Sequence, residues 1–347
     1  MDDHTWNFGG KTILVTGGTG TVGSAIVERL LDTDAEGIRI YSRDEHKQFE
    51  LRHRLPADPR LRFLIGDTRD LHRLRRAADG ANLIFHTAAM KHVYSCEYNP
   101  FEAVKTNIVG TQNVVDAAID AGVERVMFAS SDKAVNPTST MGVSKLMAEK
   151  LISAADAFRG GHPTIFTSAR FGNVVGSRGS VIPLFAEQIA AGGPVTVTDR
   201  RMTRFIMSIE HAVELMFDAL GFAKGGEVFV LKMPALRIED LALTMRESLA
   251  PLSGHRVEDV LIQEIGVPAG EKLNEELLTE EELSRCLETD DLFILLPQVR
   301  SLHPDRDPYS YPQAHEPGQA IRSDLVDPMS PDELRTLLVD CRLLSAA

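Results

Sequence analysis

The chain has 347 residues, 43% of them hydrophobic, which is enough for one large domain or two of ordinary size around a substantial core. Fifty acidic residues against 37 basic ones give a formal net charge of -13, which argues against a nucleic-acid partner bound through a basic surface. A local basic pocket for one small phosphorylated ligand remains compatible with this charge.

The cysteines and the first residues favour a cytoplasmic protein. Cys96, Cys286 and Cys341 lie far apart and lack metal-ligand spacing, so we expect reduced thiols, no disulfide framework and no metal site. The opening "MDDHTWNFGG" is acidic and polar, and no apolar run reaches the roughly 18 residues that a membrane span needs. We therefore expect no membrane partner.

Short β-branched runs alternate with helical patterns through the first half of the chain. Helical spacing of apolar residues is present at 21–32 and 99–122, and the second of these patterns stops at Gly122. The alternation predicts an α/β fold, a Rossmann-type doubly wound parallel sheet with crossover helices. Strands are expected at residues 11–17, 37–43, 61–67, 81–89, 125–130 and 164–173.

After Asn173 the pattern becomes irregular, with glycine-flanked loops, one helix and short strands. We assign residues 1–172 to a dinucleotide-binding domain, to which the chain returns at about 206–232. Residues 173–300 are assigned to a smaller substrate-binding domain. Residues 301–347 are expected to form a tail that ends in a final helix at "SPDELRTLLVD".

The segment "TGGTGTVG" follows the first strand and opens the first helix. Its glycines fall where the pyrophosphate of a dinucleotide meets a helix N-terminus. A lone glycine pattern is also compatible with a structural turn, but the strand before it and the helix after it favour nucleotide binding. The expected cofactor contacts are Gly17, Thr19, Gly20, Thr21, Val22 and Gly23.

The second and third strands end in residues that bear on the choice of cofactor. Ser42, Arg43 and Lys47 stand where an NAD site usually has an acidic residue, and a guanidinium there suits a 2′-phosphate, so NADP is favoured over NAD. The adjacent Asp44 weakens this preference. Asp67 is expected either to accept from the adenine amino group or to cap a helix.

The segment "SSDKAVNPTSTMGVSK", residues 130–145, is similar to the active site of short-chain dehydrogenases, in which a serine is followed by Tyr-x-x-x-Lys. Met141 stands at the tyrosine position, and a thioether cannot transfer a proton. Asp132 and Lys133, directly after a strand end, are an acid and a base of the kind that proton transfer requires. Lys145 lies one helical turn from Met141, so both face the same side.

Many ordered motifs between Lys11 and Pro297 resemble the nucleotide-sugar 4,6-dehydratases of bacterial polysaccharide biosynthesis, whose usual substrate is UDP-N-acetylglucosamine. The resemblance implies an extended short-chain dehydrogenase fold, NADP as cofactor, a UDP-sugar as substrate and a homo-oligomer, dimeric or larger. The motifs are "SRDEHKQ", "GDTRD", "AAMKHV", "EYNP", "KTNIVGTQNV", "SSDKAVNPTSTMGVSK", "ARFGNVVGSRGSVIPLF", "MTRFIMS" and "GEKLNEELL".

In these dehydratases hydride leaves sugar C4 for NADP, the resulting ketone acidifies the C5 proton, water is lost across C5 and C6, and the hydride returns to C6. The resemblance implies that Asp132 protonates the departing hydroxyl and that Lys133 is the base at C5. We expect burial to lower the pKa of Lys133 and to raise that of Asp132. Lys145 is implied to hold the nicotinamide ribose.

A branch of the same family also carries Met-Gly-x-Ser-Lys, so Met141 is compatible with activity. Lys133 or an ordered water then accepts the C4 hydroxyl proton, and Met141 packs against the cofactor or the sugar. Lys91 is implied to contact both ligands. Further implied cofactor contacts are Thr68, Ala88, Ala89, Lys91, Asn107, Ser130 and Lys145, and implied substrate contacts are Lys91, Ser131, Asn173, Ser180, Val181, Thr196, Arg204 and Glu271.

Arg204 is expected to pair with the diphosphate in a bidentate manner, Asn173 to hold a sugar or phosphate oxygen, and Glu271 to accept from ribose hydroxyls. One position departs from the family. Pro268 replaces the arginine of the usual Arg-Pro-Gly-Glu-Lys motif and has no donor for a phosphate. Either Arg204, Arg178 or another cation takes its place, or the nucleotide end of the substrate differs.

The main interpretation is therefore a UDP-N-acetylglucosamine 4,6-dehydratase, with or without inversion at C5. A UDP-sugar 5,6-dehydratase or a 4-epimerase is the second, although an epimerase needs neither Asp132 nor Lys133. The third is a non-catalytic nucleotide-binding protein. The retained charges at Asp132, Lys133 and Lys145 argue against the third interpretation.

Overall fold

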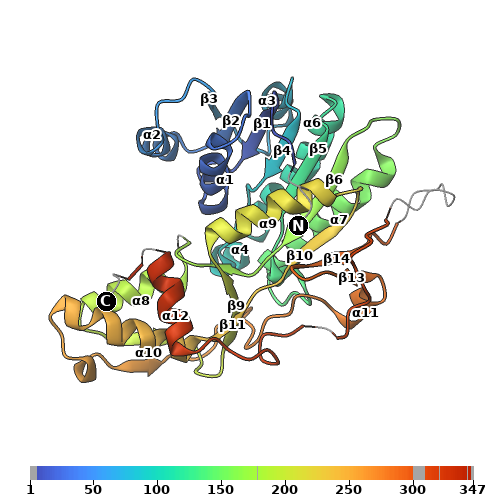
Figure 1. Cartoon of the computed structure of the whole chain (residues 1–347). Helices are drawn as coiled ribbons and strands as arrows, with labels where there is room; N and C mark the ends of the chain where they lie inside the picture. Colours follow the sequence, from blue (N-terminus) through green and yellow to red (C-terminus); the bar gives the residue numbers. More distant parts are fainter. Residues whose placement is uncertain (1–5, 178, 300–308, 320, 342, 345–347) are drawn as a thin grey trace.

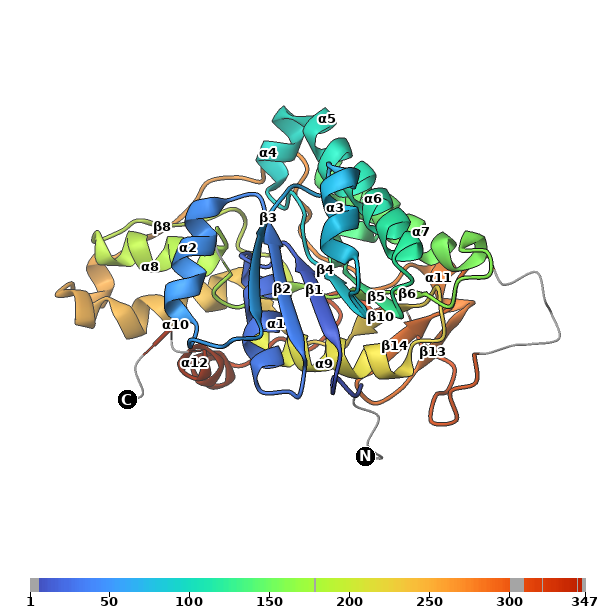
Figure 2. The same cartoon turned by 90° about the horizontal axis from the view of Figure 1, so that it is seen from above.

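The computed structural model describes residues 6–177, 179–299, 309–319, 321–341 and 343–344. Its centre is a nine-stranded sheet with the order β13-β14-β10-β6-β5-β4-β1-β2-β3 (Figures 1 and 2). The strands are β1 (Thr12–Thr16), β2 (Gly37–Ser42), β3 (Leu61–Ile65), β4 (Leu83–His86), β5 (Arg125–Ala129), β6 (Ile165–Arg170), β10 (Val228–Leu231), β13 (Cys286–Glu288) and β14 (Leu292–Leu295).

The strands from β10 to β3 pair in parallel, and β14 and β13 extend the sheet in antiparallel fashion. Because helices cover both faces of a parallel sheet, its strands are continuously apolar. In β1, Ile13 and Val15 belong to the core on one face, and Leu14 belongs to the core on the other. The predicted Rossmann-type α/β fold is confirmed.

Each face of the sheet has its own set of helices. On one face α1 (Thr21–Leu31) contacts α9 (Ile209–Phe222), and the buried Leu51 of α2 (Glu45–Arg54) joins the same core. On the other face α6 (Gly110–Asp120) lies between α3 (Leu71–Ala78) and α7 (Thr140–Phe158). The sheet is therefore the middle layer of three.

The helix expected at 99–122 begins as α5 (Pro100–Ala103), passes through the π-helical segment η1 (Val104–Val109) and continues as α6. It is preceded by α4 (Val93–Tyr98). Segments of π-helix inside α-helices are frequent at functional sites. Here η1 carries the buried Asn107 toward the loop that follows β4.

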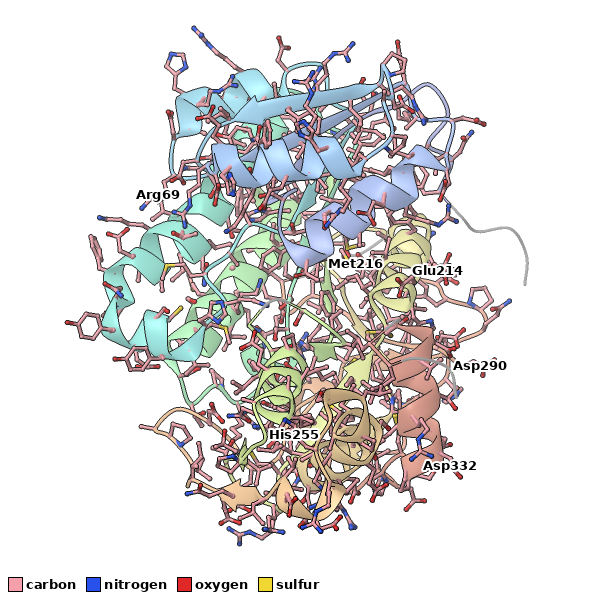
Figure 3. All side chains as sticks on the ribbon, turned by 90° about the vertical axis from the view of Figure 1, so that its left-hand side faces the viewer. Arg69, Glu214, Met216, His255, Asp290 and Asp332 are labelled. Atoms are coloured by element: carbon pink, nitrogen blue, oxygen red, sulfur yellow. The ribbon has the colours of Figure 1, made fainter. Side chains whose placement is uncertain are left out.

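The smaller lobe contains two short sheets and three longer helices around a separate apolar core (Figure 1). His255, after α10, and Asp332, at the start of α12, lie in this lobe, whereas Arg69 lies in the sheet domain (Figure 3). The sheets are β11-β9-β7 and β12-β8, formed by β7 (Asn173–Val174), β8 (Val195–Val197), β9 (Thr203–Met207), β11 (Ala235–Arg237) and β12 (Ile262–Glu264). The helices are α8 (Val181–Ala190), α10 (Ile238–Leu249) and α12 (Pro331–Asp340), with short turns η3 (Pro251–Ser253) and η4 (Val257–Asp259).

The boundary expected at residue 300 differs from the structure at one place. Residues 286–295, assigned from the sequence to the smaller domain, form β13 and β14 of the large sheet. Their apolar run pairs with β10, which the sequence already placed in the large domain. The short helix α11 (Glu280–Leu283) leads into them. Residues 301–308 of the expected tail lie outside the described residues.

A buried guanidinium joins α11 to the sheet. Arg170, fully buried at the end of β6, bonds to Glu149 of α7 at 2.6 Å and to Glu282 of α11 at 2.9 Å. It also donates to the carbonyl of Leu277 at 2.9 Å. Removing one partner of such a buried pair typically costs about 3–5 kcal/mol, because a charge is left without a counterion.

Within the described residues, no helix combines the length and apolarity that a membrane crossing requires. The same residues contain no group of three or more His, Cys, Asp or Glu side chains placed to hold a metal ion. The three cysteine side chains are free thiols.

Candidate active site

The loop between β1 and α1 is tight enough to bring backbone N–H groups close to a phosphate. Gly17 has φ +71°, and a Cβ at this position would lie 2.6 Å from the amide nitrogen of Ala88. A Cβ on Gly23 would lie 2.4 Å from the carbonyl oxygen of Gly17. Gly20 is the N-cap of α1 and provides no side-chain cap. Thr19 lies in this loop, and Thr21 and Val22 begin α1; the loop and the helix N-terminus together fit a dinucleotide pyrophosphate.

At the end of β2, the Arg43 side chain is 59% exposed and lies 3.8 Å from Asp67. Lys47 forms an ion pair with Asp44 at 3.2 Å, and Asp44 also caps α2 by accepting from the Lys47 amide at 3.0 Å. Ser42 is buried and its hydroxyl accepts from Gln48 at 3.1 Å. The acidic side chain nearest to Arg43 in sequence is therefore engaged by the helix that follows it.

Asp67 does not cap the following helix, because the N-cap of α3 is Asp70, so that alternative is wrong. Its carboxylate instead pairs with Arg69 at 2.7 Å. Burial opposes its ionisation, but Arg69 and Arg43 outweigh this effect and hold the pKa of Asp67 below its usual range. The adenine contact stays a prediction. Thr68 beside it is buried.

The loop after β4 begins with Ala88 and Ala89, next to Gly17, and continues to the exposed Lys91. Asn107 fixes this loop: its Oδ1 accepts from the Met90 amide at 2.7 Å, and its Nδ2 donates to the Met90 carbonyl at 3.0 Å and to Ser144 at 2.8 Å. The amide of Asn107 is therefore used within the protein. These bonds position the loop after β4, and the expected cofactor contact of Asn107 stays a prediction.

The two serines that follow β5, Ser130 and Ser131, point in different directions. The hydroxyl of Ser130 donates to Glu149 at 2.6 Å, away from the expected cofactor, because Glu149 needs a donor in a buried setting. Ser131 caps the short turn η2 (Asp132–Ala134) and donates to Asp132 Oδ1 at 2.9 Å. Ser131 thus joins the Asp132–Lys133 pair, and the expected cofactor contact of Ser130 stays a prediction.

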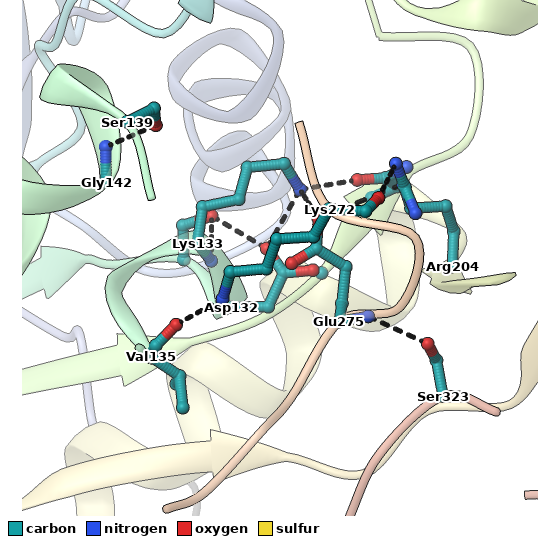
Figure 4. A network of polar contacts seen from close by, with 12 residues as sticks. Asp132, Lys133, Val135, Ser139, Gly142, Arg204, Lys272, Glu275 and Ser323 are labelled. Carbon is teal, nitrogen blue, oxygen red and sulfur yellow. Dashed lines mark hydrogen bonds and ion pairs between the residues drawn. The ribbon is translucent and has the colours of Figure 1, made fainter. Parts of the chain in front are cut away.

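Asp132 and Lys133 form the centre of a polar cluster between the two lobes (Figure 4). Asp132 is fully buried, and its Oδ1 accepts from Lys133 Nζ at 3.0 Å. Lys133 Nζ also donates to Asn173 Oδ1 at 3.0 Å and lies 3.6 Å from Glu275 Oε1. Among the described residues, Asp132 Oδ2 has no hydrogen-bond partner. A substrate hydroxyl placed there would meet an acid and an amine together.

The pKa of Lys133 moves in the direction opposite to the expected one. Burial lowers it, but the carboxylates of Asp132 and Glu275 outweigh burial and raise the pKa of Lys133 above its ordinary value. The expectation of a lowered pKa was wrong because it counted burial without the opposing charges of Asp132 and Glu275. In this state Lys133 holds its proton.

Lys145 is buried on α7, where Nζ donates to the Ala129 carbonyl at 2.5 Å and lies 4.0 Å from the centre of the Phe128 ring. Burial lowers the pKa of Lys145 to about 7, against a partial opposing effect of Glu149. The side chain therefore changes charge near neutral pH unless an anionic ligand holds it protonated.

Met141 is buried in a small apolar cluster with Cys96 and Ala103, against which Met90 and Val93 pack. These residues come from α4, α5 and the loop after β4. A thioether suits such a cluster because it needs no hydrogen-bond partner. Met141 thus contributes packing around the cofactor-side loop and transfers no proton.

Arg204 is engaged by backbone carbonyls of its own strand and of residues 272–273. It is buried, and its NH groups donate to the carbonyls of Thr203 at 2.8 Å, Leu273 at 3.0 Å and Lys272 at 2.9 Å. Its Nε lies 3.8 Å from Glu275. In this structure the guanidinium holds the 272–273 backbone, and the expected diphosphate contact stays a prediction. Arg178 lies outside the described residues.

The remaining predicted substrate contacts lie apart from this cluster. Ser180 is the N-cap of α8 without a side-chain cap bond, and Val181 begins that helix. Thr196 on β8 accepts from Gln188 at 2.7 Å. Glu271 is exposed in the loop after Pro268, whose carbonyl accepts from its amide at 3.2 Å. Asn173, by contrast, contacts Lys133 directly.

Glu275 is the site residue that sequence reasoning missed. It is 3% exposed and lies next to Lys133, although it is far from residues 130–145 in sequence. The motif "GEKLNEELL" contains it, but nothing in the sequence distinguishes it from the motif's two other glutamates, Glu271 and Glu276, as buried. Its neighbour Lys272 was also missed and donates to the Val135 carbonyl at 2.6 Å.

Comparison with known proteins identifies a matching family model and several relatives of this chain. The family model described as "Polysaccharide biosynthesis protein" matches residues 13–297. The chain is 41% identical over 317 residues to the UDP-N-acetylglucosamine 4,6-dehydratase (inverting) of Campylobacter jejuni, covering 91% of each chain. It is also 41% identical over 297 residues to the UDP-glucose 4-epimerase of Rickettsia rickettsii, covering 84% of this chain and 85% of that one.

Solved structures agree with the sequence relatives. The X-ray structure of Pen from Bacillus thuringiensis superposes with a TM-score of 0.90 at 43% identity, covering 97% of this chain and 99% of that one. The dTDP-glucose 4,6-dehydratase DesIV from Streptomyces venezuelae, solved with NAD bound, gives a TM-score of 0.68 at 26% identity, covering 76% of this chain and 86% of that one.

Lys145→Met is expected to stabilise the ligand-free protein more at low pH than at high pH. The folded-state pKa of about 7 lies below the unfolded value of 10.5, so the unfolded chain binds more protons between these values and wild-type stability rises with pH there. Denaturant titration should show a gain in the free energy of unfolding that is roughly 2–3 kcal/mol larger at pH 6 than at pH 9. Lys150→Met on the same helix is the control, and an equal gain at both pH values would contradict the shift.

Proposed function

Because the chain belongs to the polysaccharide biosynthesis protein family, we propose that it is a nucleotide-sugar dehydratase, and specifically a UDP-N-acetylglucosamine 4,6-dehydratase that uses NADP. The observation that carries the proposal is the buried Asp132 in contact with Lys133 at the carboxyl end of β5. Acid and base lie side by side there, at the edge of the sheet where α/β folds bind their ligands.

The nicotinamide cofactor supplies one chemical function when bound, which is to take hydride from sugar C4 and return it to C6. The glycine loop of β1 and α1 fits its pyrophosphate, because a Cβ at Gly17 or Gly23 would clash with neighbouring backbone. Lys145, at the start of α7, is proposed to hold the nicotinamide ribose. Asn107 keeps the Ala88–Ala89 loop in place beneath it.

The proton chemistry belongs to the residues after β5. Once C4 is a ketone, the C5 proton is acidic, and Lys133 is proposed to remove it. Asp132 is proposed to give its proton to the C6 hydroxyl, which leaves as water. Asn173 holds the Lys133 amine in place through a 3.0 Å hydrogen bond. Since Met141 has no exchangeable proton, Lys133 or an ordered water takes the C4 hydroxyl proton.

A 4-epimerase is the second candidate, because the Rickettsia relative carries that name. An epimerase needs neither a base at C5 nor an acid at C6, so a fully buried Asp132 paired with Lys133 would serve no step of its reaction. A 5,6-dehydratase would use the same pair and differs in the bond pattern of its product. A non-catalytic binding protein gains nothing from the desolvation cost of these charges.

Purified protein with NADP and UDP-N-acetylglucosamine should yield a product that has lost one water, seen by mass spectrometry. Proton NMR of the reaction in heavy water should show a 4-keto-6-deoxy sugar with deuterium at C5 and should report its C5 configuration. Lys133→Ala should abolish dehydration while cofactor binding persists, and the exposed Lys224→Ala is the control. An unchanged substrate mass across UDP- and dTDP-sugars would overturn the proposal, and a C4 epimer would favour the second candidate.

NADP is proposed over NAD because of the charges at the end of β2. Arg43 is more than half exposed beside the glycine loop edge of the sheet, and the nearby Asp44 is engaged with Lys47. A guanidinium can bond the 2′-phosphate in a bidentate manner, whereas ribose hydroxyls are usually held by an acid. The DesIV neighbour was solved with NAD bound, which supports a nicotinamide dinucleotide as the cofactor of this chain. The Arg43 argument concerns the 2′-substituent, in which NADP differs from NAD.

Arg43→Ser should weaken NADP binding by about 10- to 100-fold, the loss expected for a charge-assisted hydrogen bond of about 1.5–3 kcal/mol. NAD binding should change little. Calorimetric titration with both dinucleotides measures the difference, and the exposed Arg52→Ser on α2 is the control. Equal losses of affinity for NADP and for NAD would show that Arg43 does not bind the 2′-phosphate.

A second copy of this chain is proposed to cover the face formed by α4, α5, η1 and α7, which contact one another. Large apolar side chains are exposed on all four elements, and the rings of Tyr94 and Tyr98 stack 6.4 Å apart. Exposed apolar patches of this kind mark association surfaces. The exposed side chains are Tyr94, Tyr98, Phe101, Val109, Val143 and Met147.

The double substitution Tyr98→Glu and Phe101→Glu should convert an oligomer into a monomer. It places two negative charges in a surface that must lose its bound water when two copies associate. Light scattering coupled to gel filtration measures the mass. Leu252→Glu, equally exposed but in the smaller lobe, is the control. An unchanged oligomer would exclude this face.

The other proposed partner is the nucleotide sugar alone. The net charge of -13 speaks against nucleic acid, and no basic surface is needed for the proposed reaction. We propose a cytoplasmic location because the proposed cofactor and nucleotide sugar are metabolites of that compartment.

A further inference from the structure

Glu275 lies in a segment that crosses from the smaller lobe to the catalytic pair. We call residues 272–282 the strap. Glu275 is 3% exposed, and its Oε1 lies 3.6 Å from Lys133 Nζ and 3.8 Å from Arg204 Nε. Its Oε2 has no hydrogen-bond partner among the described residues. A buried carboxylate oxygen without a donor is costly and calls for a functional explanation.

The strap is held firmly on both sides of Glu275. Arg204 bonds to the carbonyls of Lys272 and Leu273, and Arg170 bonds to the carbonyl of Leu277. The Glu275 amide donates to Ser323 Oγ at 2.9 Å, and the Ser323 amide donates back to the Glu275 carbonyl at 2.9 Å. Figure 4 shows Glu275 reaching toward Lys133 from this fixed backbone. Its position does not depend on its own carboxylate.

The proposed reaction gives this carboxylate a task. Lys133 must be a neutral amine to remove the C5 proton, yet three acceptors surround its ammonium: Asp132, Asn173 and Glu275. Asp132 must keep a proton for the departing hydroxyl, and an amide oxygen is too weak a base to take one. Glu275 is the remaining described group in contact with Lys133 that can accept its proton.

We propose that Glu275 takes a proton from Lys133 when a nucleotide sugar fills the site, and that this transfer makes Lys133 the C5 base. The inference rests on the proposed dehydratase function. Glu275 acts through Lys133 and is a positioning residue. Replacing water by substrate favours the neutral amine and carboxylic acid over the ion pair, because two charges are costly in a dry site.

The protons balance over one turnover. One N–H bond of Lys133 breaks as an O–H bond forms on Glu275, and the free amine then takes the C5 proton. An ordered water holds the proton that the C4 hydroxyl releases on oxidation, since Lys133 is needed at C5. Asp132 then gives its own proton to the C6 hydroxyl, and the proton held by the water replaces it. When a proton returns to C5 and product leaves, Glu275 gives its proton back to Lys133. No oxidant is needed beyond the cofactor of the proposed reaction.

The electrostatics of the pair agree with this role. Burial raises the pKa of Glu275, the Lys133 ammonium lowers it, and the neighbouring Asp132 raises it again, with a net rise above the ordinary value. Such a carboxyl is a better proton acceptor than an exposed glutamate. The pKa of Lys133 is raised largely by the same carboxylates, so loss of the Glu275 charge changes both groups together.

Glu275→Gln is the central test, since glutamine keeps the shape and accepts no proton. We expect kcat to fall about 100- to 1,000-fold with KM nearly unchanged, the scale of a lost acid-base function. The remaining activity should rise about tenfold per pH unit through the alkaline range, because neutral Lys133 must then come from solvent equilibrium. Wild type should show a plateau there. Exchange of C5 hydrogen with heavy water should fall with kcat.

Two further variants separate this role from simple support of the strap. Glu275→Asp keeps the acid and should restore the wild-type pH plateau at a reduced rate. Glu276→Gln, the adjacent residue whose carboxylate bonds to Asn136, should leave kcat unchanged. Thermal unfolding identifies any variant that fails to fold, in which case the Glu275→Asp pH profile decides.

A wild-type kcat or an unchanged pH plateau in Glu275→Gln would overturn the inference while dehydration itself stands. Wild-type protein that dehydrates no nucleotide sugar would instead overturn the proposed function. The two failures are distinguished because the first requires an active wild type.

Discussion

The buried contact of Arg170 with Glu149 and Glu282 is the interaction on which the rest of the site depends. Its guanidinium stands at the carboxyl end of β6 and joins α7, on the cofactor side, to α11, at the end of the strap. Glu149 in turn accepts from Ser130, directly before the catalytic residues. A single cation with no exposure thus fixes the spacing between the strand that carries Asp132 and the strap that carries Glu275.

This arrangement explains why buried charge is concentrated at one place in an otherwise ordinary three-layer fold. A buried ion pair contributes little net stability, since desolvation offsets much of its attraction. It does specify geometry, because the alternatives leave charges unpaired. Arg204 has the same effect nearer to the site. Its N–H groups donate to carbonyls of the strap and thereby hold the strap backbone in one position beside Lys133. Both arginines thus fix the backbone around Lys133, the base of the proposed reaction.

The sequence predicted those parts of the molecule that local patterns determine. Alternating apolar runs located the parallel strands, and the glycines after β1 located the tight turn into α1, because a strand, a tight turn and a helix each leave a short-range signature. The choice of hydrogen-bond partners between residues far apart in the sequence leaves no such signature. Arg204 and Ser130 have the chemistry of ligand contacts, yet the fold supplies them with Leu273 and Glu149 as partners.

Glu275 is a site residue that the sequence alone did not reveal. Its neighbours in sequence are polar, so nothing marks it as buried until the strap is placed against β5 and β9. The resemblance to dehydratases located Asp132 and Lys133 because their motif is contiguous. The third titratable group arrives from a segment more than a hundred residues further along the chain, and after Asp132 it is the second carboxylate that raises the pKa of Lys133.

Met141 follows from the same distribution of charge. A phenol at this position would need a hydrogen-bond partner within a cluster that contains Cys96 and Ala103, whereas a thioether needs none. Without a phenolate one turn away, Lys145 has Glu149 as its favourable charge, and burial dominates its pKa. The amine is then suited to hold a ribose rather than to activate a neighbouring acid. In the proposed reaction the proton transfers fall to Lys133 and to the two carboxylates in contact with it, Asp132 and Glu275.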